Sequence, residues 1–203
     1  MSEVVRIESG QQVVQVGEGL PTHFVSEIGL NHNGSAELAQ RLVTESVVAG
    51  ATFVKFQKRS PPALGTSAFL DAGFPKAPFF GSTQREVREF LELSSSEYRQ
   101  LMDHSAALGA VMFASAFDLP SLEFLVEHGI KLIKVASHSA TNGPLLAAVN
   151  RLGMPVLLSL GGTTLEEKDR AVSALQDCPL ILMHCVSEYP TPDQRMQLDT
   201  IGF

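Results

Sequence analysis

The sequence predicts an α/β fold in which parallel strands alternate with outer helices, as in a TIM-type (β/α)8 barrel. Six strand-like apolar segments with no hairpin among them are typical of a parallel sheet. The last four begin at about 111, 132, 155 and 180, a regular spacing, and no GxGxxG or GxxxxGK[ST] phosphate loop follows any of the six. These observations favour the barrel over an open, doubly wound sheet.

The first part of the chain predicts a hairpin and the first strand–helix unit. Val4 to Ile7 and Val13 to Val16 alternate apolar and polar residues around Ser9-Gly10, which predicts a short hairpin that covers one end of the domain. Apolar residues at helical spacing then predict the first helix. The next strand, helix and strand are expected over His23 to Gly29, Ser35 to Gly50 and Thr52 to Lys58.

The rest of the chain repeats strand and helix with clear end signals. Capping boxes open two helices, at Ser94 with Glu97 and at Thr164 with Glu167. The predicted helices are Ser94 to Gly109, Leu119 to His128, Pro144 to Leu152 and Thr164 to Gln176. The predicted strands are Val111 to Phe117, Leu132 to Ser137, Pro155 to Ser159 and Leu180 to Val186.

One segment, Arg59 to Leu93, breaks this spacing with about 35 residues before the next helix. Loops of this length inside a compact domain are commonly functional or disordered. The segment is rich in phenylalanine and proline and follows the C-terminal end of a strand, the active-site end of a barrel. We expect a lid or pocket wall; the alternative is a surface excursion that only packs on the barrel.

Composition excludes several classes of protein. Of 203 residues, 44% are hydrophobic, and 15 Lys and Arg against 22 Asp and Glu give a net charge of −7. The chain contains no apolar run of about 18 residues, so no membrane span is predicted. It also contains no run of basic residues that would bind the phosphates of nucleic acid. Two cysteines, Cys178 and Cys185, are too few for a disulfide framework. Without a leader-like N-terminus, we expect a cytoplasmic protein.

The length predicts a single domain, residues 1–203. It is nevertheless short for a barrel, which typically needs ~250 residues. About six of eight strands are recognisable. We therefore expect a barrel domain that is truncated at its C-terminal side.

Polar side chains gather at the C-terminal ends of the predicted strands. Because side chains alternate along a strand, Lys55 and Gln57 share a face and Lys55 points into the barrel, as does Lys134 on its own strand. Burying a lysine is costly unless an anion compensates. The two lysines, with nearby hydroxyls, therefore predict a site for a phosphate or carboxylate. The hydroxyls are those of Ser115, Ser137 and Ser159.

Other interpretations stay open for several of these residues. Either lysine could simply pair with Glu27 or Asp118. His184, on the last predicted strand, is either a hydrogen-bonded inward histidine or a catalytic group, and His32 is either an anion contact or an ordinary loop residue. The histidines show no HxH or HExxH spacing, so no metal site is predicted.

Six ordered segments carry a family likeness, one at each strand end or helix start. They are SEIGLNHNG (Ser26 to Gly34), VKFQK (Val54 to Lys58), FLELSSSEYRQL (Phe90 to Leu101), IKVASHSATNGPLL (Ile133 to Leu146), PVLLSLGGTTLEE (Pro155 to Glu167) and HCVSEYPTP (His184 to Pro192). Together they resemble the N-acetylneuraminate (sialic acid) synthase family from residue 22 to 200.

The resemblance implies a TIM-barrel transferase of sialic acid and carbohydrate biosynthesis. Such an enzyme condenses phosphoenolpyruvate with an N-acylated amino sugar, such as N-acetylmannosamine, and releases phosphate. The enol carbon attacks the sugar aldehyde, water adds at C2, and the intermediate loses phosphate. The expected substrate-binding residues are Lys55, Gln57, Ser115, Lys134, Ser137, Ser159, Ser187 and Tyr189. The catalytic candidates are Glu27, as the acid–base group, and His184.

The resemblance also implies features that this chain does not carry. The family uses a divalent metal, manganese or magnesium, whose ligands lie on two further βα units, and many members add a small antifreeze-like domain. Ser139 stands where the family usually has an acidic residue, which the resemblance implies would engage the amino sugar, so this departure bears on sugar specificity. His138 stands where glycine is common. We expect small-molecule substrates, no nucleic-acid or membrane partner, and a homodimer for the full-length form.

Two other functions stay open. One is a lysine Schiff-base aldolase on the same fold, which needs a lysine of depressed pKa. The other is a non-catalytic fragment or paralogue that retains anion binding. Because only about six of eight barrel strands are recognisable, it also stays open whether the 203-residue chain is active by itself.

Overall fold

The computed structural model describes residues 4–202, which fall into two units, Met1–Lys131 and Leu132–Phe203. Residues 1–3 and 203 lie outside the described residues, so the first positions of the segment considered for a leader are not described. The single domain over 1–203 stays a prediction. Each unit is described by itself.

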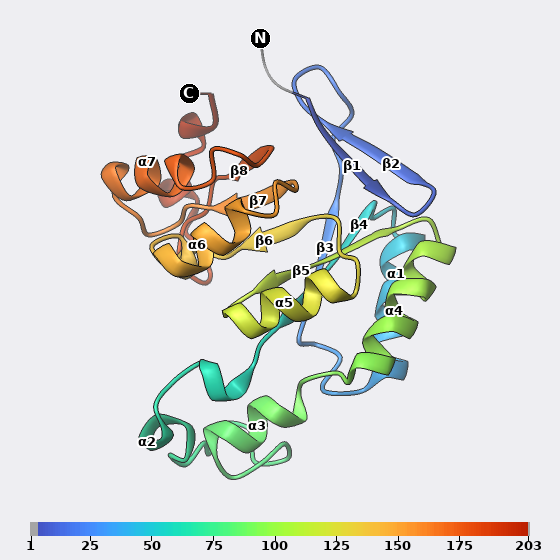
Figure 1. Ribbon diagram of the computed structural model, residues 1–203, viewed down its shortest axis with the longest axis vertical. Coiled ribbons are helices and arrows are strands. Elements are labelled where there is room, and N and C mark those ends of the chain that lie inside the picture. Colours follow the sequence, from blue (N-terminus) through green and yellow to red (C-terminus); the bar gives the residue numbers. More distant parts are fainter. Residues whose placement is uncertain (1–3, 203) are drawn as a thin grey trace. The chain divides into compact units, whose positions relative to one another are not determined.

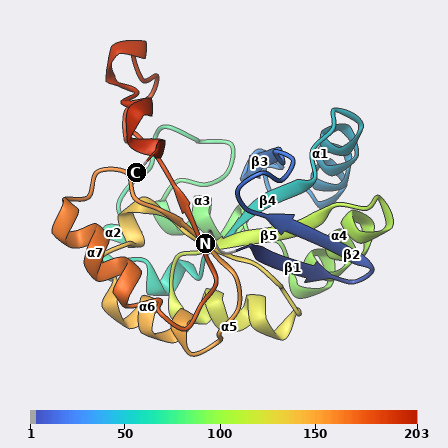
Figure 2. The ribbon, with the colours of Figure 1, turned by 90° about the horizontal axis from the view of Figure 1, so that it is seen from above.

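The first unit begins with the predicted hairpin. Strands β1 (Val5–Ser9) and β2 (Gln12–Val16) pair antiparallel around a turn in which Gly10 has a φ of 61°. Ile7 and Val14 are register partners and both are buried, so one face of the hairpin packs on the protein. The Gln15 carbonyl lies 3.1 Å from Nε2 of His23, just before the next strand. The hairpin thus covers the N-terminal end of this unit's sheet, as predicted (Figure 2).

Three parallel strands form the sheet of the first unit. They are β3 (Val25–Gly29), β4 (Phe53–Lys58) and β5 (Val111–Ala116), paired in that order. The connecting helices α1 (Ala36–Val48) and α4 (Ser95–Ala107) lie side by side (Figure 1). The helix α5 (Leu119–Glu127) follows β5 and begins at the cap residue Asp118. Strand β5 is buried along its whole length, which places the core between the sheet and these helices.

The long segment after β4 is folded into helices, so the prediction of a loop was wrong. It contains a 3-10 turn η1 (Pro61–Ala63), α2 (Ser67–Leu70) and α3 (Gln84–Phe90). A capping box of Thr83 with Glu86 opens α3, and Phe80 stacks on Phe90 with ring centroids 5.2 Å apart. Local capping and aromatic packing therefore order a segment whose composition suggested a loop. Its role as a lid stays a prediction.

The second unit repeats the parallel pattern with shorter strands. Strands β6 (Ile133–Val135), β7 (Val156–Ser159) and β8 (Leu180–Met183) pair in that order, with α6 (Gly143–Asn150) and α7 (Leu165–Ser173) between them. Strand β6 ends before the prediction because the 3-10 turn η2 (Ser137–Ser139) follows it. Strand β8 ends at Met183, so His184 lies after the strand and not on it. The short turns η3 (Asp193–Arg195) and η4 (Leu198–Gly202) complete the unit.

The order of elements confirms the predicted α/β class, with six parallel strands and a separate N-terminal hairpin. Both predicted capping boxes are present, at Ser94 with Glu97 and at Thr164 with Glu167. Among the helices of residues 4–202, none combines the length and the hydropathy of a membrane-spanning segment.

Candidate active site

Lys55 and Glu27 form an ion pair between neighbouring strands of the first unit. They are register partners on β4 and β3, and the Lys55 Nζ lies 2.8 Å from Oε1 and 2.7 Å from Oε2 of Glu27. The lysine side chain is only 7% exposed, whereas that of Glu27 is 56% exposed. The ion pair considered from the sequence is therefore present. A carboxylate that solvent can reach neutralises a buried ammonium group.

Gln57 and Ser115 lie next to this pair. They are register partners on β4 and β5, and Ser115 is buried. Gly29 has a φ of 58°, and a Cβ there would lie 3.1 Å from Glu27 Oε1 and 3.5 Å from Gln57 Nε2. The side chains of Glu27 and Gln57 thus both reach the space above Gly29, where the pairing of β3 with β4 is irregular. The first unit brings together Glu27, Lys55, Gln57 and Ser115, four of the predicted site residues.

A second charged cluster, which the sequence did not reveal, lies at the end of β4. Glu92 accepts hydrogen bonds from the Lys58 ammonium and from Nε of Arg59, each at 2.9 Å. All three side chains are 12–13% exposed. The Lys58 ammonium also lies 4.5 Å from the ring centre of Phe124. Within residues 4–202 the buried Arg59 Nη2 has no hydrogen-bond partner.

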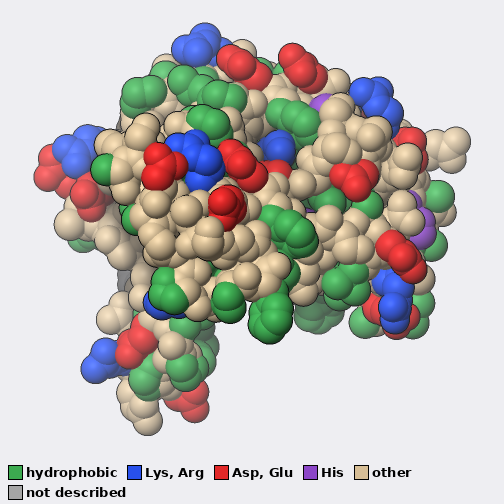
Figure 3. All heavy atoms as spheres, turned by 90° about the horizontal axis from the view of Figure 1, so that it is seen from below, with side chains coloured by type: hydrophobic (Ala, Val, Ile, Leu, Met, Phe, Trp, Pro, Cys, Tyr) green, Lys and Arg blue, Asp and Glu red, His purple; other side chains and the backbone are tan. Residues whose placement is uncertain are grey.

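Basic and acidic side chains are neighbours on the surface as well (Figure 3). A pocket of about 340 Å³ lies beside the Glu92 cluster. Its polar side chains include two basic and two acidic residues, Lys58, Arg59, Glu89 and Glu92. Equal numbers of opposite charges give this pocket no preference for an anion or a cation.

The side chains of Asp118 and His32 accept hydrogen bonds from nearby backbone amides. The two carboxylate oxygens of Asp118 accept from the amides of Ser121 and Ser60, both at 2.8 Å. His32 is 2% exposed, and its Nδ1 accepts from the Gly34 amide at 3.2 Å. Burial lowers the pKa of His32, although nearby Glu92 opposes that shift. A neutral, backbone-bonded imidazole agrees with the loop interpretation of His32.

Three serines come together in the second unit. The Ser137 Oγ accepts from the Gly161 amide at 3.0 Å, and the Ser159 Oγ accepts from the Cys185 thiol at 3.3 Å. A Cβ at Gly161 would lie 3.0 Å from the Ser187 Oγ and 2.9 Å from the Cys185 Cβ. Only glycine allows this approach without a shift of the neighbouring chain. The turn after β7 therefore contacts the segment after β8.

The hydrogen bonds of Ser137 and Ser159 determine what each hydroxyl can offer. A serine hydroxyl has one hydrogen to donate and two lone pairs to accept. In both residues the protein supplies a donor to a lone pair, and in the second unit's described hydrogen bonds neither hydroxyl donates its own hydrogen. Both O–H groups can therefore donate to a ligand that only accepts, such as a phosphate or carboxylate. Lys134, buried on β6, donates to the Val135 carbonyl at 2.8 Å.

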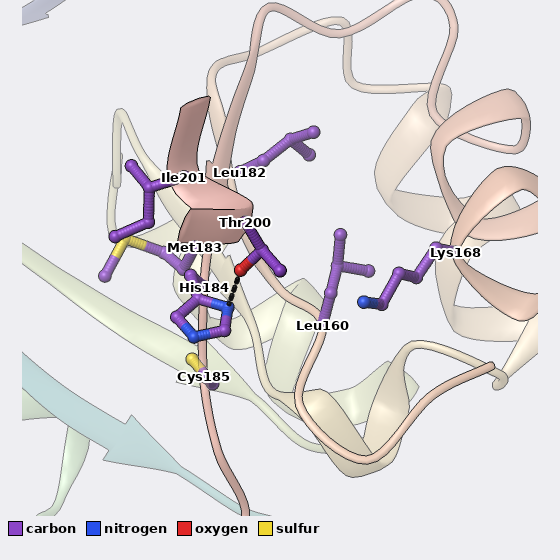
Figure 4. A pocket seen from close by; sticks show the side chains of 8 residues that line it. All are labelled: Leu160, Lys168, Leu182, Met183, His184, Cys185, Thr200 and Ile201. Carbon is purple, nitrogen blue, oxygen red and sulfur yellow. Dashed lines mark hydrogen bonds between the residues drawn. The ribbon is translucent and has the colours of Figure 1, made fainter. Parts of the chain in front are cut away.

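His184 and Tyr189 lie in exposed surroundings. The ring nitrogens of His184 lie 2.6 Å from the Met196 carbonyl oxygen (Nε2) and 3.1 Å from Thr200 Oγ1 (Nδ1). The ring lines a pocket of about 460 Å³ with Leu160 and Lys168 (Figure 4). Tyr189 is 97% exposed. The roles predicted for these two residues stay predictions.

The described residues offer no ready metal centre. Between residues 4 and 202, no group of three or more His, Cys, Asp or Glu side chains is placed to hold a metal ion. The manganese or magnesium implied by the family resemblance stays an expectation, and we assign it no ligand and no step.

Five residues of these clusters were not predicted as site residues from the sequence: Lys58, Arg59, Glu92, Gly161 and Cys185. The pair Gly161-Gly162, directly after a strand and before a helix cap, was a readable signal for close backbone approach. Glu92 and Cys185 gave no local signal, because their partners lie 33 and 26 positions away in the sequence.

Comparison with known proteins adds independent information. The NeuB family model matches residues 42–202. The chain is 37% identical over 183 residues to the N-acetylneuraminate-9-phosphate synthase of Drosophila melanogaster, an alignment that covers 89% of this chain and 49% of that protein. It is 31% identical to the N,N'-diacetyllegionaminic acid synthase of Campylobacter jejuni, covering 87% of this chain and 55% of the relative. The chain thus spans about half the length of the curated relatives it matches.

Solved structures show the same fold. One is the N-acetylneuraminic acid synthetase of Leptospira borgpetersenii, crystallised with citrate. Its alignment covers 98% of this chain and 65% of the synthetase chain, with a TM-score of 0.78 and 30% sequence identity. A DAHP synthase of Thermotoga maritima matches 93% of this chain and 48% of its own with a TM-score of 0.62 at 18% identity, which shows the fold alone. These likenesses confirm the predicted TIM-barrel type.

Proposed function

Since the chain belongs to the NeuB family, we propose that it serves the condensation of phosphoenolpyruvate with an N-acylated amino sugar, giving a nonulosonic acid and phosphate. The matched relatives are named as synthases of sialic and legionaminic acids, which supports an enzyme that forms a carbon–carbon bond. The identity of the sugar and the activity of this 203-residue chain are part of the proposal.

The observation that carries the proposal is the pattern of hydrogen bonds at two hydroxyl groups. Ser137 and Ser159 each accept a hydrogen bond from the protein, and their own hydrogens can donate to an anion. Phosphoenolpyruvate, with a phosphate and a carboxylate, is a ligand rich in acceptors. Lys134 in the same unit adds a buried positive charge.

In the first unit we assign Lys55, Gln57 and Ser115 to substrate binding and Glu27 to acid–base chemistry. Glu27 is suited to passing a proton because its carboxylate is exposed and is held by Lys55 at two oxygens. An anion that engages Lys55 competes with Glu27 for the ammonium group. Substrate binding would thereby release the Glu27 carboxylate from its ion pair with Lys55.

For the second unit we keep Ser187 and Tyr189 as substrate contacts and His184 as the second catalytic candidate. Both nitrogens of His184 lie at hydrogen-bonding distance from the segment 196–200, so it can act only when that contact opens. The Schiff-base alternative gains no support. The Lys55 amine is bound by a carboxylate and that of Lys134 donates to a carbonyl oxygen, whereas a nucleophilic amine must be free and neutral.

Calorimetric titration with phosphoenolpyruvate tests the proposal. We expect the wild-type chain to bind it and Lys134→Met to bind about tenfold more weakly, since one charge-assisted contact is lost. Lys131→Met is the matched control, because it removes the same charge from an exposed position. Absence of binding by the wild type, or equal loss in both variants, would contradict the proposal.

Two further assays separate the alternatives. Release of phosphate that depends on N-acetylmannosamine would show that this chain turns over by itself. Binding without release would favour the non-catalytic alternative, a fragment or paralogue that retains anion binding. Trapping of pyruvate by borohydride on Lys55 or Lys134 would establish the aldolase instead.

A further inference from the structure

Cys185 contacts one of the proposed substrate-binding groups directly. Its Sγ lies 3.3 Å from the Ser159 Oγ and donates to it. Ser159 ends β7 and its register partner is Met183, so Cys185 follows two residues beyond that partner. The thiol therefore reaches the hydroxyl from the segment after β8. Figure 4 shows Cys185 beside His184, at the edge of the pocket that both line.

The position of this thiol is closely constrained. A Cβ at Gly161 would lie 2.9 Å from the Cys185 Cβ and 3.0 Å from its carbonyl oxygen, so the backbone of the turn after β7 lies directly against it. The Gly161 amide in turn donates to Ser137. One turn thus links the two proposed anion-binding serines and the cysteine, and Cys185 has little room to move away from Ser159.

We propose that Cys185 is a positioning residue that keeps the Ser159 hydroxyl oriented as a hydrogen-bond donor to the anionic substrate. The thiol hydrogen occupies one lone pair of the Ser159 oxygen, which directs the serine O–H away from the cysteine. Without that donor the hydroxyl loses a constraint on its rotation. The inference rests on the proposed function and adds to it a residue that does not itself touch the substrate.

The test compares the affinity for phosphoenolpyruvate of a small set of variants. We expect Cys185→Ala to weaken binding about fivefold, the loss of one modest hydrogen bond. Cys185→Ser retains an O–H donor and should stay within about twofold of the wild type. Cys178→Ala is the matched control, because the other thiol is buried and bonded to the Val149 carbonyl. It should leave the affinity unchanged.

A double-mutant cycle with Ser159→Ala separates positioning from general damage. If Cys185 acts through Ser159, adding Cys185→Ala to Ser159→Ala should cause no further loss. Thermal unfolding of each variant shows that it is folded. Equal binding by Cys185→Ala and the wild type, a serine variant as weak as the alanine variant, or additive losses would each overturn the inference while leaving the proposed function standing. Failure of the wild type to bind would instead reject the proposed function, and this inference with it.

Discussion

Replacing Glu92 by glutamine tests the charged cluster at the end of β4. The Glu92 carboxylate binds both Lys58 and Arg59 at 2.9 Å and accepts from the Arg59 amide at 3.3 Å, and all three side chains are 12–13% exposed. Removing one partner of a buried ion pair costs ~3–5 kcal/mol, because the remaining charge stays desolvated. Glutamine keeps one acceptor oxygen, so we expect a loss of about 3 kcal/mol in the free energy of unfolding.

Urea unfolding followed by circular dichroism measures this loss. With a slope of about 2 kcal/mol per molar urea, the midpoint should fall by about 1.5 M. Glu166→Gln is the matched control, since it breaks an exposed i,i+4 pair with Arg170 and should cost only ~0.5 kcal/mol. A Glu92→Gln variant as stable as this control would refute the reasoning that the cluster is held by buried charge.

Three further predictions concern a glycine, a histidine and the two thiols. Gly34 and Gly129 have φ of 77° and 78°, but a Cβ at Gly34 would lie 2.4 Å from the Phe90 carbonyl oxygen and one at Gly129 meets nothing within 4 Å. In urea unfolding, Gly34→Ala should therefore lose well over the ~1 kcal/mol expected for Gly129→Ala, and equal losses would contradict the steric argument. Burial lowers the folded-state pKa of His32 below its usual 6.5, so the unfolded chain takes up that proton first and stability should fall as the pH drops below 6.5. His32→Gln should reduce the fall in the free energy of unfolding below pH 6.5. An unchanged slope would show that other titrating groups cause this pH dependence. N-ethylmaleimide should label the half-buried Cys185 faster than Cys178, whose thiol pKa is raised by burial. Bound phosphoenolpyruvate should slow the labelling of Cys185. Mass spectrometry of the labelled peptides measures both rates, and equal rates for the two thiols would contradict the prediction.

Much of the fold was predictable because its signals are local. The capping boxes at Ser94 and Thr164 and the apolar periodicity placed the helices and strands within a few residues of their observed ends. The helix α3 was missed although Thr83 and Glu86 carry the same capping signature, because the phenylalanine and proline residues before it suggested a loop. Strand β6 ends before a 3-10 turn that starts at Ser137, and β8 gives way to irregular chain after Met183; alternation of residue types reveals neither end.

The candidate site was predictable in its residue types but not in its contacts. Strand alternation placed Lys55 and Gln57 on one face, and the ion pair of Lys55 with Glu27 was one of two interpretations that the sequence left open. Which donor binds the Ser159 hydroxyl depends on the approach of Cys185 from the segment after β8. Such approaches are set by tertiary packing, so they became visible only in the structure.

The contact between Arg59 and Glu92 spans 33 positions and joins the two ends of the helical excursion that contains α2 and α3. Because the ion pairs of Lys58 and Arg59 with Glu92 hold the two ends of this excursion together, its length can change while the strand and helix that flank it stay in place. Doubling the length of a flexible loop costs only ~0.6 kcal/mol in closure entropy. The irregular stretch between α2 and α3 is therefore a natural place for evolution to lengthen the chain, and for a designer to insert a reporter or a second binding module.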